Sequence, residues 1–481
     1  MEESEWIDES TVSPHVKEAK YAVRGELVLR AMEIEKKLLA NPEAFPFDKV
    51  VYCNIGNPHQ LGQKPLTFPR QVLALLACPE LIKNERLGFL CDVVERAQKY
   101  LDKIPGGIGA YSNSQGLEIV RHEVAAFLEQ RDGYPSHIDN IFLTNGASAA
   151  VVLMVSLMLK DKHDALMIPI PQYPLYSASI ALQGGTVAGY YLDESSGWSC
   201  SSNALQDAYN ESVRNGARPR GIVVMNPGNP TGQVFSVEEL EAILRFANKN
   251  RLVVFADEVY QTNIYSSSFV SFRKVLLDIQ TCKRELLDQQ LITLHSVSKG
   301  FTGECGLRGG FMELIGFDES VKLQVYKLLS IMLCSNLVGQ VAVGLMVNPP
   351  RQGSPSYQLY EKERSSLISS LKRRAEKIVS HLNELDGVRC SKVSGALYTF
   401  PSITLPEKAV KKAESIGIAP DAFYCMELLN NCGIVCVPGS GFGQVDGTFH
   451  FRTTILPAEE DLDSVLEAIS TFHKNFMSIY R

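Results

Sequence analysis

The chain has 481 residues, of which 45% are hydrophobic and 21% charged, and a formal net charge of −7. This composition is typical of a globular protein with a sizeable core, long enough for one large domain and a smaller one, or for three ordinary domains. The acidic balance and the lack of a Lys/Arg-rich run argue against a nucleic-acid partner.

Cysteine usage and the chain ends indicate a compartment. The eleven cysteines are scattered, without a C-x-x-C pair, which predicts reduced thiols inside a cell. The first ten residues are acidic and resemble neither a signal nor a transit peptide, and the last three, Ile479-Tyr-Arg481, are not a Ser-Lys-Leu address. The longest apolar run, residues 147–159, is too short to cross a bilayer. We therefore expect a cytoplasmic protein, rather than a peroxisomal or mitochondrial one, with no membrane partner.

The first third of the chain is predicted to be mainly helical. Residues 14–39 have helical character, residues 51–55 resemble a short strand, and residues 68–102 are helical with a break near Pro79. A glycine-rich loop at residues 105–109 then leads to Tyr111.

From about residue 140, strands and helices alternate. The predicted strands cover residues 141–144, 165–169, 221–225, 252–256 and 291–295. An apolar helix that opens at residues 146–148 follows the first of them. The strands are continuous apolar runs, which is typical of a sheet covered by helices on both faces. The pattern predicts an α/β domain with a largely parallel sheet.

A long charged helix is predicted over residues 356–385, and short strands and helices follow it. We assign residues 76–349 to a large domain, residues 350–481 to a smaller α/β domain, and residues 1–75 to an N-terminal segment that contributes to the small domain. The two domains join at Asn348-Pro-Pro350.

The most informative motif surrounds Lys299. The run Ser296-Val-Ser-Lys299-Gly300 follows a predicted strand, and Arg308 comes nine residues after the lysine. A lysine in this setting can form a Schiff base with the aldehyde of pyridoxal phosphate, while the Ser296 hydroxyl and the Arg308 guanidinium reach the phosphate.

Two upstream motifs fit the same cofactor. Asp257 ends a predicted strand, where a carboxylate can pair with the pyridine nitrogen, and Tyr260 can hydrogen-bond the ring oxygen. Asn229, in Asn226-Pro-Gly-Asn229-Pro, can bond the same oxygen. The alternatives are a capping aspartate and a tight double turn.

Ala147 and Ser148 open a helix directly after a strand, so their backbone N–H groups and the serine hydroxyl can hold a phosphate. The alternative is that Ser148 only caps the helix. Tyr173 can stack on the cofactor ring, or simply pack in its Pro-rich loop.

Arg452 can fork onto a substrate carboxylate, an interaction of about 1.5–3 kcal/mol. The alternative is a surface salt bridge. Residues 439–443 are glycine-rich but predict a turn, not a nucleotide loop, and the nine histidines show no metal-ligand spacing, so we expect no metal site.

With Asn229, Asp257, Tyr260, Ser296, Lys299 and Arg308 in this order, the chain resembles the fold-type I pyridoxal phosphate aminotransferases of class I/II, from about Tyr21 to its end. Residues 52–58, 109–116, 169–179 and 437–443 resemble alanine aminotransferases within that class. The resemblance implies the three-layer fold-type I architecture and a homodimer with active sites at its interface. It also implies that Tyr111 reaches the partner's cofactor phosphate and that Gly56 lies beside the substrate.

The activity implied is a ping-pong transfer from L-alanine to 2-oxoglutarate, giving pyruvate and L-glutamate. Lys299, Asp257 and Tyr260 would be catalytic, and Gly56, Asn229 and Arg452 would bind the substrate. The alternatives are a glutamate:glyoxylate aminotransferase and a lyase of the same fold. A regulator built on this fold would need a DNA-binding domain ahead of Tyr52, for which the preceding residues are too few.

Overall fold

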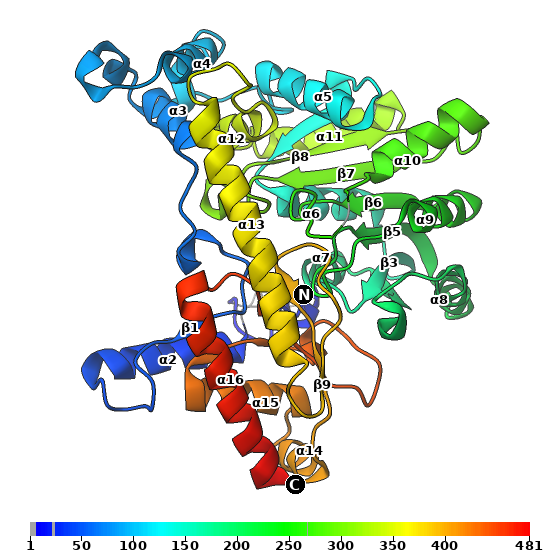
Figure 1. Ribbon diagram of the computed structural model, residues 1–481. Coiled ribbons are helices and arrows are strands. Elements are labelled where there is room, and N and C mark those ends of the chain that lie inside the picture. The colour runs from blue at the N-terminus through cyan, green and yellow to red at the C-terminus, as the bar shows by residue number, and fades with distance from the viewer. Residues whose placement is uncertain (1–5, 22–24, 267) are drawn as a thin grey trace.

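A seven-stranded sheet forms the centre of the protein, in the order β2-β8-β7-β6-β5-β3-β4 (Figure 1). The computed structural model describes residues 6–21, 25–266 and 268–481. The strands are β2 (Ile141–Thr144), β3 (Asp164–Ile170), β4 (Thr186–Tyr191), β5 (Arg218–Met225), β6 (Val253–Asp257), β7 (Leu291–Ser296) and β8 (Gly310–Ile315). Only β8 runs antiparallel to its neighbours, β2 and β7. The predicted largely parallel sheet is therefore confirmed, although β4 and β8 were not among the predicted strands.

Both faces of the sheet are buried. In β6, Val253 and Phe255 belong to the core on one face, whereas Val254 and Ala256 belong to the core on the other. The first face packs against α6 (Ala147–Met158), α7 (Leu175–Leu182) and α11 (Glu319–Ile331). The second packs against α8 (Ser202–Arg214), α9 (Val237–Lys249) and α10 (Phe272–Asp278). This three-layer packing explains why the strands are apolar at consecutive positions.

Further helices cover the β2 end of the sheet. They are α3 (Thr67–Ala77), α4 (Cys91–Leu101), α5 (Glu118–Asp132) and α12 (Leu337–Val347), which share one apolar core with β2. From there α13 (Tyr357–Leu382) runs past the sheet to contact α16 (Glu459–Tyr480) (Figure 1). This helix confirms the long charged helix expected at residues 356–385.

Short strands and helices make up the part of the chain around α16. The helices are α14 (Glu407–Ser415) and α15 (Pro420–Cys432), and the strands are β9 (Val388–Arg389), β10 (Tyr398–Thr399), β11 (Ser402–Ile403), β12 (Ile434–Val435), β13 (Val437–Pro438) and β14 (Phe451–Thr454). The N-terminal segment joins this part, because β1 (Val51–Tyr52) pairs in parallel with β12, and α2 (Glu26–Ala40) packs on α15. The domain boundaries given above stay predictions.

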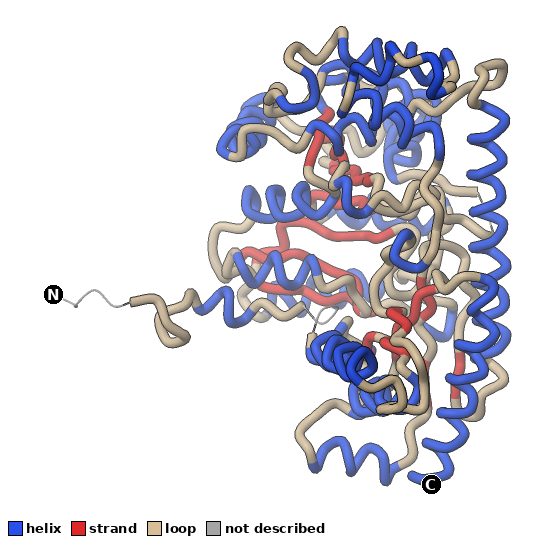
Figure 2. Tube along the Cα trace, turned by 90° about the vertical axis from the view of Figure 1, so that its left-hand side faces the viewer, coloured by secondary structure: helices blue, strands red, loops and turns tan. Residues whose placement is uncertain are grey.

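The N-terminal region differs in detail from the expectation. Residues 14–39 form two helices, α1 (Pro14–Glu18) and α2, and residues 22–24 lie outside the described residues. Figure 2 shows residues 6–13, before α1, pointing away from the body. The strand expected at residues 51–55 ends at Tyr52, because the chain turns where the Asn57 N–H donates to the Ile55 carbonyl at 2.8 Å. The break near Pro79 is confirmed by a 3₁₀ helix at Pro79–Lys83. Within the described ranges, no helix is both long and apolar enough to span a membrane.

Truncation of a central sheet residue tests the packing. Phe255 is fully buried in β6, so Phe255→Ala should lower the free energy of unfolding by about 3–5 kcal/mol through lost burial and the cavity it leaves. Chemical denaturation followed by circular dichroism measures this. Val237→Ala, at an exposed position of α9, should change stability by no more than ~0.5 kcal/mol. Equal losses in the two variants would contradict the assignment of Phe255 to the core.

Candidate active site

A cavity of about 1120 Å³ opens at the carboxyl ends of β5, β6 and β7, where Met225, Asp257 and Ser296 line it. Ligands of open α/β sheets bind at this edge. The cavity collects most of the residues singled out in the sequence: Gly56, Ala147, Ser148, Tyr173, Asp257, Tyr260, Ser296, Lys299, Arg308 and Arg452. Two of the predicted residues, Asn229 and Tyr111, are not in its lining.

Lys299 extends from the loop after β7 across the cavity. Its Nζ donates to the Gly56 carbonyl at 2.8 Å and lies 5.9 Å from the centre of the Tyr260 ring. A Cβ atom at position 56 would lie 2.2 Å from the Tyr398 hydroxyl oxygen and 3.1 Å from Lys299 Nζ. Glycine is thus required at position 56 for the lysine to approach the backbone.

Asp257 ends β6 with its carboxylate buried at the base of the cavity. The Tyr176 hydroxyl donates to Oδ2 at 2.8 Å. Burial raises the pKa of Asp257 to about 6, although the Tyr176 hydroxyl, the Val259 N–H and Lys299 oppose that rise. A cation placed against this carboxylate would favour its ionised form.

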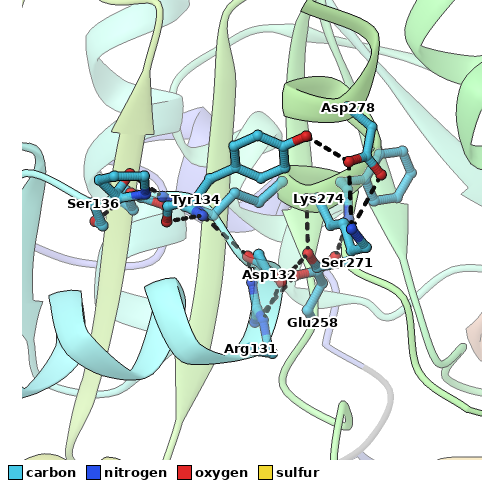
Figure 3. Close-up of polar contacts among 12 residues, drawn as sticks. Arg131, Asp132, Tyr134, Ser136, Glu258, Ser271, Lys274 and Asp278 are labelled. Atoms are coloured by element: carbon cyan, nitrogen blue, oxygen red, sulfur yellow. Dashed lines mark hydrogen bonds and ion pairs between the residues drawn. The ribbon is translucent and has the colours of Figure 1, made fainter. Parts of the chain in front are cut away.

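A cluster of buried charges supports β6 away from the cavity (Figure 3). Arg131 forks onto Asp132 at 2.7 Å, and its Nη1 lies 4.0 Å from Glu258 Oε2. Arg273, also buried, contacts Asp132 at 3.3 Å and Glu313 at 2.9 Å. Two guanidinium groups therefore face three carboxyl groups.

Glu258 is the group that balances this cluster. It is buried, and its Oε1 accepts the Phe272 N–H at 2.7 Å. Burial raises the pKa of Glu258 to about 8, although Arg131 and the Phe272 N–H lower it. Near pH 7 Glu258 is therefore mainly protonated, and the charges of the other four groups cancel.

An anion-binding corner forms where α6 begins. Gly146 occupies the N-cap position with no side-chain capping bond, so Ser148 does not cap the helix as the alternative reading required. Arg308 donates to the Ser298 hydroxyl at 3.3 Å and to the carbonyls of Cys305 and Asn145, each at 3.1 Å. Each of these acceptors is neutral. The helix start, the hydroxyls of Ser148, Ser296 and Ser298, and an arginine without a carboxylate partner suit a phosphate.

Arg452, on β14, is 1% exposed. Its Nη1 donates to Asn229 Oδ1 at 2.9 Å and its Nη2 to the Asn54 carbonyl. The guanidinium carbon lies 4.2 Å from the centre of the Tyr398 ring and 4.7 Å from that of Phe442. Its Nε has no hydrogen-bond partner among the residues described. The surface salt bridge considered for Arg452 is therefore wrong, and this buried cation, surrounded by neutral groups, suits a carboxylate from solution.

The remaining predicted residues occupy different places. Asn229 lies behind the cavity wall, where it contacts Arg452 and, through Nδ2, the Tyr260 hydroxyl at 3.5 Å. Tyr173 lines the cavity, and its hydroxyl lies 2.8 Å from that of Tyr21. Tyr111 is 77% exposed.

Sequence reasoning missed several side chains of the site, among them Tyr176, Ser298 and Tyr398. Ser298 stands inside the Lys299 motif, and its position beside the lysine was an available signal. Tyr176 lies within residues 169–179, which carry part of the family resemblance, but nothing in its spacing links it to Asp257. Burial raises the pKa of Tyr398, yet Lys299, Arg452 and the Tyr260 hydroxyl together lower it below its ordinary value.

The sheet order, with this cavity at its carboxyl edge, defines a fold-type I enzyme. The solved structure of an alanine aminotransferase from Pyrococcus furiosus has the same fold, with a TM-score of 0.76 at 24% identity over 96% of this chain and 100% of that one.

The chain belongs to the aminotransferase class I and II family, whose model matches residues 80–469. It is 49% identical to the probable mitochondrial alanine aminotransferase of Dictyostelium discoideum, over 98% of this chain and 89% of that protein. It is also 45% identical to glutamate–glyoxylate aminotransferase 2 of Arabidopsis thaliana, over 98% of this chain and 97% of that protein. The expectation of an aminotransferase is confirmed.

The protonation of Glu258 gives a test of the buried cluster. A carboxyl whose folded pKa is about 8, against 4.5 ordinarily, loses its proton first in the unfolded chain as the pH rises. As the pH rises between these two values, the free energy of unfolding of the wild type should therefore fall relative to that of Glu258→Gln, by roughly a few kcal/mol. Urea denaturation of both proteins, prepared alike at pH 5 and pH 8.5, measures the change, and Asp257 titrates in both. A stability difference that does not vary with pH would rule out a protonated Glu258.

Proposed function

We propose that this protein is an alanine aminotransferase that transfers the amino group of L-alanine to 2-oxoglutarate by a ping-pong mechanism. The observation that carries the proposal is Arg452, a buried cation that has no carboxylate partner among the described residues and faces the same cavity as Lys299 and Asp257. An amino acid whose carboxylate is held there has its α-carbon in the same cavity as the Lys299 amine and the Asp257 carboxyl group. The names of several relatives that are 45–49% identical over nearly the whole chain support this substrate pair.

Pyridoxal phosphate is the cofactor used by this family, and the residues present fit it. Ser296, Ser298, Arg308 and the start of α6 would hold its phosphate, where Arg308 lacks a carboxylate partner. Asp257 would contact its ring nitrogen, Tyr260 and Asn229 its ring oxygen, and Tyr173 its ring face. When bound, the cofactor supplies an aldehyde that reacts with amines and a ring that withdraws electrons from the α-carbon of the amino acid.

The protein's own groups would then divide the work. Arg452 holds the α-carboxylate with its bidentate fork, and Gly56 leaves room beside Lys299. The Lys299 amine would take the proton from the α-carbon and pass it to the carbon that was the cofactor's aldehyde; in the second half-reaction it would move a proton the opposite way. Asp257, oriented by the Tyr176 hydroxyl, would be ionised and would keep the proton on the cofactor's ring nitrogen. The same groups serve both half-reactions in opposite directions.

Two other activities fit the same cavity. One relative is named a glutamate–glyoxylate aminotransferase, so glyoxylate is an alternative acceptor. A lyase would form a keto acid without any acceptor, and the dependence of pyruvate formation on 2-oxoglutarate separates it from a transferase. The cytoplasmic location stays a prediction, since some relatives are named as mitochondrial.

We also propose a homodimer in which Tyr111 serves the partner's site. Tyr111 is 77% exposed and belongs to no wall of its own cavity. Near it the Ser114 hydroxyl donates to the Leu333 carbonyl at 2.7 Å, and Ile331, Met332 and Leu333 are 74%, 57% and 51% exposed. Consecutive exposed apolar side chains beside Tyr111 are what an interface between two copies would cover.

The first functional test exchanges Arg452 for lysine. Arg452→Lys keeps the charge but loses the fork, so KM for L-alanine and for 2-oxoglutarate should both rise, by about tenfold or more. Steady-state assays with alanine, glutamate, 2-oxoglutarate and glyoxylate measure this, with Lys299→Ala as the inactive control. If KM rises for one substrate only, Arg452 does not serve both half-reactions.

The dimer is tested by mixing two defective proteins, Tyr111→Phe and Lys299→Ala, under conditions of subunit exchange. In a shared-site dimer, one site of the heterodimer carries both defects and the other carries neither. Activity should therefore rise above that of either parent. Mass spectrometry confirms that heterodimers have formed. If heterodimers form without any gain in activity, Tyr111 acts within its own chain.

A further inference from the structure

The cavity contains one more arginine than the proposed reaction has used. Arg308 and Arg452 suit the cofactor phosphate and the α-carboxylate, but Arg70, from α3, lines the same cavity. Its Nε and Nη2 donate to the two carboxylate oxygens of Glu304 at 2.7 and 2.8 Å. His59 completes the group, with Nδ1 3.8 Å from Glu304 Oε2, and all three residues line the cavity.

This group lies close to the reactive lysine. Cys305, the residue after Glu304, has its sulfur 3.6 Å from the Gly56 carbonyl, which also accepts a hydrogen bond from Lys299 Nζ. The segment of residues 54–59 contacts Arg452 through the Asn54 carbonyl and contributes His59 beside Glu304. Lys299 meets the segment at Gly56, between these two positions. Arg452 and the Arg70–Glu304–His59 group therefore lie toward opposite ends of this segment, with Lys299 between them.

The two partners of the Arg70–Glu304 pair differ in exposure. The Arg70 side chain is 45% exposed, whereas that of Glu304 is 9% exposed. Arg70 can therefore turn toward a ligand without a buried cation being stranded. His59 would remain beside Glu304 when Arg70 leaves it, and its Nε2 has no hydrogen-bond partner among the described residues.

The proposed pair of substrates needs such a device. Alanine and pyruvate carry a methyl group where glutamate and 2-oxoglutarate carry a second carboxylate. An unpaired arginine would leave an uncompensated charge beside the methyl group, and an apolar wall would reject the carboxylate. An arginine with its own acidic partner is neutralised when the substrate carries a methyl group, and it is available when the substrate carries a second carboxylate.

We propose that Arg70 binds the side-chain carboxylate of five-carbon dicarboxylic substrates, and that Glu304 neutralises Arg70 when alanine or pyruvate is bound. The inference rests on the proposed function, and it deepens that function by assigning the specificity for the second substrate.

The test compares the two amino donors on the cofactor-loaded protein. Single-turnover absorbance gives kcat/KM for L-glutamate and for L-alanine separately. Arg70→Gln should lower the glutamate-to-alanine ratio by ~10-fold or more, since a charge-assisted bond is lost for glutamate alone. Arg70→Lys should give an intermediate ratio. Glu304→Gln should raise the ratio, because it frees Arg70. The matched control is Arg214→Gln. Arg214 is an exposed arginine of α8, which packs on the face of the sheet opposite to α6 and α7.

A second readout does not depend on turnover. Calorimetric titration with glutarate, which has both carboxylates but no amino group, should show weaker binding to Arg70→Gln than to the wild type, while propionate binding falls much less. If Arg70→Gln lowers kcat/KM equally for both donors, or lowers the affinity equally for glutarate and propionate, Arg70 only stabilises the position of α3 and the proposal is overturned. If Arg70→Gln does not fold, an unaltered ratio in Arg70→Lys and Glu304→Gln overturns it. If the wild-type protein accepts neither amino acid, the proposed function itself fails.

Discussion

Charge pairing differs between the arginines behind β6 and those of the cavity. Behind β6, Arg131 and Arg273 are matched by carboxylates at 2.7–3.3 Å. In the cavity, the exposed Arg308 and the buried Arg452 contact carbonyls, a hydroxyl, an amide oxygen and aromatic rings. Because a buried charge without a counter-charge is costly, the cavity favours anionic ligands, and the paired cluster behind it supplies the rigid support.

Much of the fold could be predicted from the sequence because the sheet is buried on both faces. The five predicted strands are apolar at consecutive positions, and the structure has a strand at each. The edge strand β4 was missed because Thr186–Tyr191 alternates between buried and more exposed positions and includes Gly189. The antiparallel β8, Gly310–Ile315, was missed because it begins with a glycine and because Glu313 interrupts its apolar run.

The site was predictable where its residues carry local motifs. Asp257 ends β6, Lys299 follows β7 and Arg308 lies just before the antiparallel β8, so the sheet topology brings them to one edge. Tyr398 and Tyr176 could not be found in this way. Tyr176 contacts Asp257, which is 81 positions away in the chain, and Tyr398 contacts Tyr260, which is 138 positions away. Arg70 and Glu304 belong to the same class, because they are 234 positions apart in the chain. Long-range pairs of this kind are fixed by the packing of α3 and the loop after β7, which no local pattern specifies.

The environment of Arg452 has a practical consequence for solution work. A cation held between two aromatic rings and two amide oxygens does not distinguish a substrate carboxylate from that of a buffer. If Arg452 holds the substrate carboxylate as proposed above, acetate, citrate or similar anions will compete for the same place and reduce the apparent affinity for amino acids in proportion to their own binding. Affinities measured in carboxylate buffers and in amine buffers will therefore differ even when pH and ionic strength are equal.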